Sequence, residues 1–334
     1  MTTLQELDDL RWEAYQLGIT NPDIYPAEQL KTLIRKKKTT NSNYKRGIWL
    51  NPRKIKDPTF RRIIGAQEAK KAILNSIVRP TQRPELYPLG WERCILLFGP
   101  PGTGKTLLAA ETAREINAEF IEKDSASIQS KWIGEASQNV AKLFNEARQA
   151  LKLYKSKRPI IIFIDEVDSL FGKPDGCRDY NVEMRSQFLK EMDGVQDKGS
   201  NLYLYMIAST NKPWNLDDGF LRRFQKRIYI DLPDDGERTK LLKLYTKKLK
   251  MVPSFNFYPI SELCAGYSGS DIRDMCRDAH QVTLDRLFKS NDPGSFPEPI
   301  SEEDFESVIK RRNRTVSFNQ VNEYEEWAQH NQAS

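Results

Sequence analysis

The chain has 334 residues, 39% hydrophobic and 29% charged, which is enough for about two domains with full cores. No apolar run approaches the roughly 20 residues that cross a bilayer, so no transmembrane segment is expected. The four cysteines lack C-x-x-C spacing and the two histidines lie far apart, which argues against a zinc ribbon or a disulfide scaffold. With no secretory signal visible, the sequence predicts a cytoplasmic protein.

Positive charge is concentrated near the N-terminus. The net charge is +6, yet residues 31–62 alone carry twelve basic residues and one acidic residue, a net +11, and the rest of the chain carries −5. A charge run of this kind is commonly a solvated face or a linker. It also suits an anionic membrane surface, a nucleic acid or an acidic tail of a protein substrate. These alternatives stay open.

In chain order, the first elements are two short helices, expected over 5–18 and 26–38, and a linker rich in Asn, Pro and Lys at 39–60. Strand-like and helix-like stretches then alternate up to about residue 233, which is typical of a parallel sheet covered by helices. The expected strands are Cys94–Phe98, Glu119–Ile121, Ile160–Ile164, Tyr203–Ala208 and Arg227–Ile230. Helices are expected over 107–115 and 136–150.

The last hundred residues are predicted to be helical. The expected helices are 236–250, 258–265, 269–288 and 302–312. The sequence therefore predicts three parts, namely an arm at 1–60, an α/β domain at 61–234 and a helical domain at 235–334.

A glycine-rich loop follows the first strand. The segment from Gly99 to Thr106 matches G-x-x-x-x-G-K-[ST] and leads into good helix formers, as a phosphate-binding loop requires. Backbone N–H groups of such a loop, together with the N-terminus of the next helix, bind phosphate oxygens. We expect Lys105 to reach the β- and γ-phosphates of ATP and the Thr106 hydroxyl to bind Mg²⁺. The predicted nucleotide-binding residues of the loop are Pro100, Pro101, Gly102, Thr103, Gly104, Lys105, Thr106 and Leu107.

Two carboxylates follow a second apolar strand. Ile160–Ile164 is expected to be a central strand because it is apolar throughout, and Asp165 and Glu166 come directly after it. Parallel sheets bind ligands at the carboxyl ends of their strands. We expect Asp165 to bind the Mg²⁺ ion and Glu166 to act as the base that activates water.

From about Ile63 onward the sequence resembles the AAA ATPases. The matching segments are Ile64–Lys70 for the opening segment, Ser209–Asn211 for sensor 1, Leu221–Phe224 for the arginine fingers and Gly266–Ile272 for the start of a lid helix. The resemblance implies an AAA+ fold, with a P-loop parallel sheet carrying helices on both faces and a small helical lid. It also implies that Asn211 contacts the attacking water or the γ-phosphate, and that Gly65, Gly269 and Ser270 line the nucleotide site.

The arginine segment implies an oligomer. Leu221 stands where the family usually has a first arginine, so Arg222 and Arg223 are the candidate fingers. By the family pattern they project into the ATP site of a neighbouring subunit, where a guanidinium stabilises charge on the γ-phosphoryl group. A homo-oligomer is therefore expected, most simply an ATP-dependent hexamer. The alternative is a solvated basic edge.

Within the family, the chain resembles the meiotic clade of katanin, spastin, fidgetin, the vacuolar-sorting ATPases that disassemble ESCRT-III filaments, and archaeal cell-division relatives. Lys131, Trp132 and Ile133 match the pore loop of that clade; the alternative is a tryptophan in the core. Ser317 is expected to cap a last helix, with an apolar face of Phe318, Val321, Tyr324 and Ala328.

The sequence leaves two candidate functions. The first is an ATP-driven motor that threads or disassembles an ESCRT-III-like protein polymer through a central pore. The alternative is a nucleic-acid motor or loader that is recruited through the basic arm.

Overall fold

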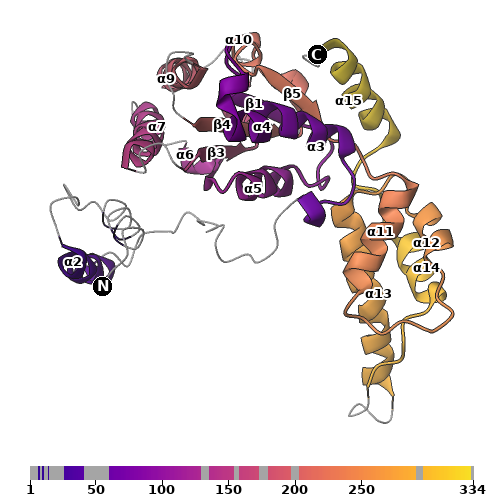
Figure 1. The fold of residues 1–334 in the computed structure, drawn as a ribbon. Helices are drawn as coiled ribbons and strands as arrows, with labels where there is room; N and C mark the ends of the chain where they lie inside the picture. The colour runs from indigo at the N-terminus through magenta and orange to yellow at the C-terminus, as the bar shows by residue number, and fades with distance from the viewer. Residues whose placement is uncertain are drawn as a thin grey trace.

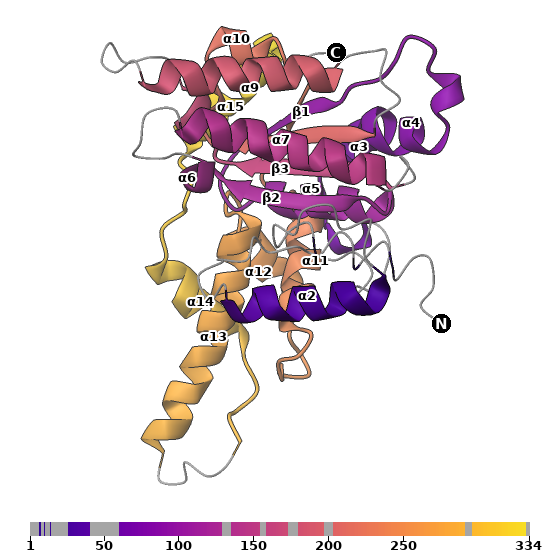
Figure 2. The same cartoon turned by 90° about the vertical axis from the view of Figure 1, so that its left-hand side faces the viewer.

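A computed structural model gives the fold (Figures 1 and 2). The structure describes residues 26–40, 60–128, 135–153, 158–172, 180–196, 203–290 and 296–331, together with Leu7, Leu10 and Ala14. Within these ranges no helix has both the length and the apolar character needed to cross a bilayer.

A five-stranded parallel sheet is the centre of the larger lobe. Its spatial order is β2-β3-β4-β1-β5, and every neighbouring pair is parallel. The strands are β1 (Cys94–Phe98), β2 (Glu119–Asp124), β3 (Ile160–Asp165), β4 (Leu204–Thr210) and β5 (Lys226–Tyr229). The central strands β1 and β4 are buried along their whole length, as expected for strands with helices on both faces. The predicted α/β fold is confirmed, with strand ends that differ by up to three residues.

Helices cover both faces of the sheet. One face packs against α7 (Glu135–Leu153) and α9 (Tyr180–Gln196) and faces the viewer in Figure 2. The other packs against α5 (Lys105–Glu115) and a helix that runs through α3 (Gln67–Ile73), a π-helical turn η4 (Leu74–Val78) and α4 (Arg79–Gln82). Shorter elements complete the lobe: η3 (Phe60–Arg62), η5 (Pro84–Leu86), α6 (Ser125–Ile128), α8 (Asp168–Phe171), η6 (Pro213–Asn215) and α10 (Asp218–Leu221).

The helical lid has a hydrophobic core of its own, built around buried side chains such as Ile272 and Phe305. Its helices are α11 (Asp235–Thr246), α12 (Phe257–Leu263), α13 (Gly269–Lys289) and α14 (Glu302–Arg311). Capping boxes fix the starts of three of them, at Asp234, Ser268 and Ser301, because each capping side chain and its partner satisfy N–H groups that the helix leaves unpaired. The four predicted helices are therefore present, and α11 ends four residues earlier than expected.

The N-terminal part contains helix α2 (Ala27–Thr40), which runs two residues into the expected linker. Leu30 and Ile34 are buried against Ala14, Leu7 and Leu10, so an apolar contact joins the two N-terminal segments. Most of the predicted first helix and of the linker lies outside the described residues.

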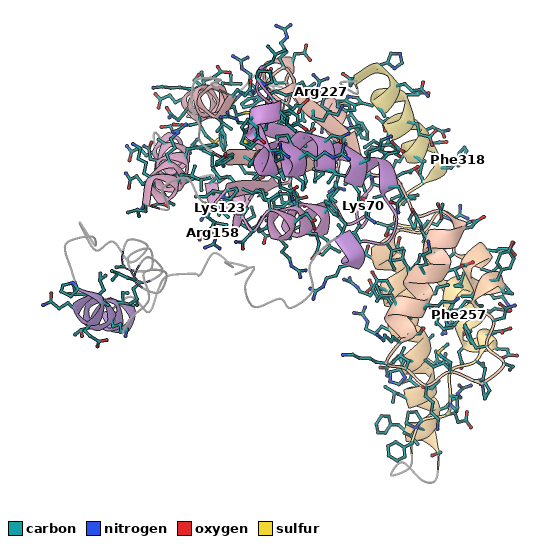
Figure 3. The ribbon with its side chains drawn as sticks, viewed as in Figure 1. Lys70, Lys123, Arg158, Arg227, Phe257 and Phe318 are labelled. Atoms are coloured by element: carbon teal, nitrogen blue, oxygen red, sulfur yellow. The ribbon has the colours of Figure 1, made fainter. Side chains whose placement is uncertain are left out.

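The last helix, α15 (Phe318–Asn331), leaves the lid and packs back against the sheet beside β5 (Figure 1). Ser317 caps it, because its Oγ accepts the Gln320 N–H at 3.3 Å. The expected apolar face was partly wrong. Tyr324 and Ala328 are buried, whereas Phe318 is 73% exposed and points away from the body (Figure 3). Trp327 packs on Phe98 instead, since a small rotation of the helix brings the bulkier ring to the sheet.

Trp327→Ala is expected to lower the free energy of unfolding by about 2–4 kcal/mol, because it removes a large ring from the contact between α15 and β1. Phe318→Ala on the same helix should change it by less than about 0.5 kcal/mol. Urea unfolding of the two variants measures both values. Equal effects of the two substitutions would contradict the packing of α15 on the sheet.

Candidate nucleotide-binding site

The predicted phosphate loop connects β1 to α5. Gly99, Gly102 and Gly104 all have positive φ, at 142°, 76° and 92°, and residues other than glycine rarely adopt such values. At Gly102 a Cβ would lie 2.0 Å from the Ser270 Oγ on the lid. Glycine is therefore required in this loop for two reasons, its backbone conformation and, at Gly102, the close approach of α13.

Lys105 begins α5 and is almost fully buried. Its Nζ donates hydrogen bonds to the main-chain oxygens of Gly99 and Pro100, at 2.9 and 2.8 Å. Burial lowers the pKa of this ammonium to about 8, and the nearby carboxylates of Asp165 and Asp168 oppose the shift. A partly desolvated cation at the end of the sheet is suited to bind an anionic phosphate.

Asp165 ends β3 and is the centre of a set of hydrogen bonds from three chain segments. Its Oδ2 accepts the Thr106 hydroxyl at 2.9 Å, and its Oδ1 accepts the Ser209 hydroxyl and the Glu166 N–H. The Ser125 hydroxyl donates to its main-chain oxygen at 2.7 Å. The structure therefore brings together the two residues expected to bind Mg²⁺.

Glu166 follows with an exposed side chain and a φ of 53°. This left-handed conformation is costly for a glutamate and is typical of functional positions. Hydrogen bonds hold it, because the hydroxyls of Ser125 and Ser169 both donate to the Glu166 main-chain oxygen. The carboxylate is thereby directed off the strand end into solvent.

Asn211 lies one residue beyond β4, on the same edge of the sheet. Its Oδ1 is buried and has no hydrogen-bond partner. The preceding Thr210 hydroxyl donates to Asp168 at 2.6 Å. Asp168 was not predicted from the sequence, although its position in the same acidic loop, three residues after Asp165, could have indicated it.

The lid contacts the phosphate loop directly. The Ser270 N–H donates to the Gly102 oxygen at 3.2 Å, and a Cβ on Gly269 would lie 3.4 Å from the same oxygen. Gly65, with a φ of 77°, lies elsewhere, where a Cβ would come within 2.2 Å of the Glu237 carboxyl group on α11. The lid residues Gly269 and Ser270 are therefore at the loop, whereas Gly65 lies where the large lobe meets the first lid helix.

The donor set fits a nucleoside triphosphate with Mg²⁺. The glycine backbone and Lys105 are suited to phosphates, and Thr106 and Asp165 offer the oxygen ligands that Mg²⁺ prefers. Among the described residues no group of three His, Cys, Asp or Glu could hold a metal ion. The unpaired Asn211 oxygen is available to a further polar group at this edge.

The two candidate arginine fingers differ in their surroundings. Arg223 donates to both carboxylate oxygens of Asp193 on α9, at 3.0 and 3.2 Å. Arg222 is exposed, and no described residue forms a salt bridge with it. Arg185 of α9, near the same segment, pairs with Asp217 at 3.4 Å. Lys131, Trp132 and Ile133 lie outside the described residues.

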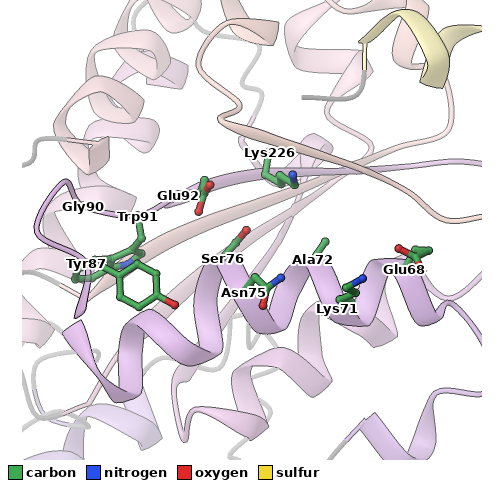
Figure 4. Close-up of a pocket in the computed structure, with 10 residues that line it drawn as sticks. All are labelled: Glu68, Lys71, Ala72, Asn75, Ser76, Tyr87, Gly90, Trp91, Glu92 and Lys226. Atoms are coloured by element: carbon green, nitrogen blue, oxygen red, sulfur yellow. The ribbon is translucent and has the colours of Figure 1, made fainter. Parts of the chain in front are cut away.

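A separate pocket of about 450 Å³ lies between α3 and the edge strand β5 (Figure 4). It is lined by polar side chains of α3 and by Tyr87 and Trp91, which meet edge to face. None of its lining residues belongs to the phosphate loop, so it is not part of the nucleotide site.

Comparisons with known proteins agree with this site. The family described as "ATPase family associated with various cellular activities (AAA)" matches residues 95–232, and the AAA+ lid domain matches residues 254–306. The chain belongs to the AAA ATPase family and is an ATPase.

The curated relatives include cell division protein C of Sulfolobus acidocaldarius, which is 47% identical over 80% of this chain and 70% of its own length. Spastin of Xenopus tropicalis is 39% identical over 80% of this chain, which spans only 44% of that relative. Among solved structures, the FIGL-1 AAA domain in complex with ADP superposes with a TM-score of 0.73 at 30% identity, over 83% of this chain and 93% of that one. A katanin structure described as the basis for its self-assembly gives 0.67 at 29% identity, over 81% and 91%. The predicted resemblance to the meiotic clade is confirmed.

The affinity for ATP is expected to fall as the pH rises above about 8. Lys105 loses its proton there in the free protein, and a bound phosphate raises its pKa, so the affinity is full below pH 8 and declines above it. Nucleotide-binding titrations between about pH 7 and pH 9.5 measure the decline. Lys105→Met should bind weakly and show no step near pH 8; an identical step in this variant would contradict the assignment.

Proposed function

We propose that this chain is an ATP-driven motor that remodels a protein polymer. The observation that carries the proposal is the convergence of the Lys105 ammonium, the Thr106–Asp165 pair and the unpaired Asn211 oxygen at one edge of the sheet. These groups come from β1–α5, β3 and β4, and together they are the parts that ATP hydrolysis needs.

In the proposed site, Thr106 and Asp165 hold the Mg²⁺ ion, which neutralises charge on the phosphates when bound. Lys105 binds the β- and γ-phosphates, and Asn211 orients the attacking water. Glu166 takes a proton from that water, because it directly follows Asp165 at the carboxyl end of β3 and its side chain is exposed. The glycine backbone of the loop and the N-terminus of α5 stabilise the phosphate charge.

Arg222 is proposed to complete the site of a neighbouring subunit. Its guanidinium is exposed, and in a ring assembly it would neutralise charge on the neighbour's γ-phosphoryl group. Arg223 is tethered to Asp193 in its own chain, which points to a role in orienting this segment. The described self-assembly of katanin, a structural relative, supports an oligomer; a hexamer is the proposed state.

Two grounds support a polymer substrate, namely the residues of the proposed pore loop and the similarity to the relatives described above. A ring of Trp132 side chains, flanked by Lys131 and Ile133, would grip an extended peptide with little sequence preference. An ESCRT-III-like filament is the proposed substrate, in line with the similarity to a cell division protein. The +11 charge of residues 31–62 favours one second candidate, a nucleic-acid motor, because such a segment binds phosphate backbones.

Arg222→Ala is expected to lower ATP turnover on the order of 10³-fold while nucleotide binding is retained. Glu166→Gln should lower it by about 10²–10⁴-fold for a different reason, the loss of the base. Mixing the two inactive chains should restore activity, since some interfaces then combine an intact base with an intact finger. Arg277→Ala, an exposed arginine on the lid, is the control and should be fully active. A mixture that stays inactive after subunit exchange would contradict a shared site.

Trp132→Ala is expected to abolish remodelling while basal ATP hydrolysis is largely retained, because the proposed role of the indole ring is to bind the substrate peptide and not the phosphates or Mg²⁺. Trp132→Phe, which keeps an aromatic ring, should retain part of the remodelling rate. The substrate for this assay is the protein that co-purifies with the Glu166→Gln chain in ATP. Full remodelling by Trp132→Ala, together with ATPase stimulation by DNA that falls steeply between about 50 and 200 mM salt, would favour the nucleic-acid motor.

A further inference from the structure

Helix α15 brings a buried tyrosine to the sheet edge that carries the nucleotide site. The Tyr324 hydroxyl donates a hydrogen bond to the main-chain oxygen of Asn211. Tyr324 is 4% exposed, and its ring lies beside those of Trp214 and Tyr229, with centroids 5.0 and 6.3 Å away. Tyr324 is 113 residues away in sequence, and no nucleotide-binding motif includes it.

This contact acts at Asn211, whose side-chain Oδ1 is buried without a partner. The residues on either side of Asn211 are held, because the Lys212 N–H donates to the Thr210 hydroxyl at 2.9 Å and that hydroxyl donates to Asp168. The Asn211 carbonyl is held by Tyr324 alone among the described hydrogen bonds. Since the direction of a side chain follows its backbone, the tyrosine contact helps fix where the Asn211 amide points.

Further contacts of α15 hold Tyr324 at this position. Trp327, one turn further along α15, packs edge to face on Phe98 with centroids 4.6 Å apart, and Phe98 directly precedes the phosphate loop. Arg227 of β5 donates to the Asn331 oxygen at 2.8 Å near the end of α15 (Figure 3). Burial raises the pKa of Tyr324 to about 12, so its hydroxyl remains a donor at any working pH.

The segment before α15 is fastened to the lid. The Thr315 hydroxyl donates to Asp271 at 2.5 Å, and Arg312 pairs with Asp278 at 2.5 Å. Asp271 lies in the first turn of α13, next to Ser270, whose N–H donates to the phosphate loop. The C-terminal segment therefore joins the lid to the Asn211 position as well as to β1.

We propose that Tyr324 is a positioning residue for ATP hydrolysis, and that its hydroxyl holds the Asn211 main chain so that the docked helix α15 sets the rate of the chemical step. The proposal rests on the role of Asn211 in the proposed function. A loss of this one hydrogen bond leaves the phosphate loop, Lys105 and the Mg²⁺ ligands unchanged. It therefore affects kcat and leaves the binding of ATP as it is.

The test compares two tyrosines of the same aromatic cluster in the full chain. Tyr324→Phe keeps the ring and removes the hydroxyl, and kcat should fall about three- to tenfold at unchanged KM, as for the loss of one buried hydrogen bond. Tyr229→Phe is the matched control, because its hydroxyl donates to Asp231 at 3.0 Å and not to Asn211; its kcat should be unchanged. Melting temperature and sedimentation are measured for both, so that a loss of folding or assembly is seen directly.

A double-mutant cycle with Asn211→Ala tests whether Tyr324 acts on kcat through Asn211. If Tyr324 acts through Asn211, Tyr324→Phe causes no further loss of kcat in the Asn211→Ala background. An additive loss, an unchanged kcat, a change in KM alone, or a kcat loss that only follows a lower melting temperature would each overturn the proposal. Full turnover by Asn211→Ala alone would instead refute the role of Asn211 in the proposed function, so the two failures are distinguishable.

Discussion

The carboxylate of Asp165 is the interaction on which the rest of the site depends. A parallel sheet buried on both faces can place polar groups only at its ends, and Asp165 is the residue at which β3 reaches the carboxyl edge. Hydroxyls from Thr106, Ser209 and Ser125 converge on it or on its main chain. The phosphate loop, β4 and the segment after β2 are thereby held together around one charge. Hydrogen bonds to an ionised carboxylate are stronger than those between neutral groups, and preorganised polar groups are what stabilisation of a transition state requires.

The second constraint is the closeness of the lid. The Ser270 Oγ would lie 2.0 Å from a Cβ on Gly102, and the Glu237 carboxyl group 2.2 Å from a Cβ on Gly65, so a side chain on either glycine would displace a lid residue. Two glycines far apart in sequence are thus needed for contact between the lobes as well as for backbone conformation. The C-terminal segment adds a third link, since it is fastened to α13 and then packs on β1. For this reason, a movement of the lid is expected to shift the phosphate loop and Asn211 together.

Much of this arrangement could be predicted from the sequence, because continuous apolar strands and the glycine-rich loop are strong local signals. Helix α9 was not predicted, although Met184, Phe188 and Met192 form an apolar stripe at helical spacing. The charged residues between them make that pattern weak in the sequence. The helix over 67–82 was missed because Pro80 normally interrupts a helix. The orientation of α15, which exposes Phe318 and packs Trp327 on Phe98, depends on the shape of the sheet surface. The tethers of Arg223 to Asp193 and of Tyr324 to Asn211 join distant segments, and no local pattern reports such contacts.

The central claim is that ATP binds with its terminal phosphates between Lys105 and Asn211, with the metal ion held by Thr106 and Asp165. An experimental structure of the Glu166→Gln chain with ATP and Mg²⁺ tests it most directly. The account predicts that the Lys105 ammonium contacts the β- and γ-phosphates and that the Asn211 amide faces the γ-phosphate. It also predicts an arginine from a second chain, Arg222, at the same phosphate. A nucleotide bound away from the loop, for example in the pocket beside Trp91, or a γ-phosphate that Asn211 does not face, would contradict the account.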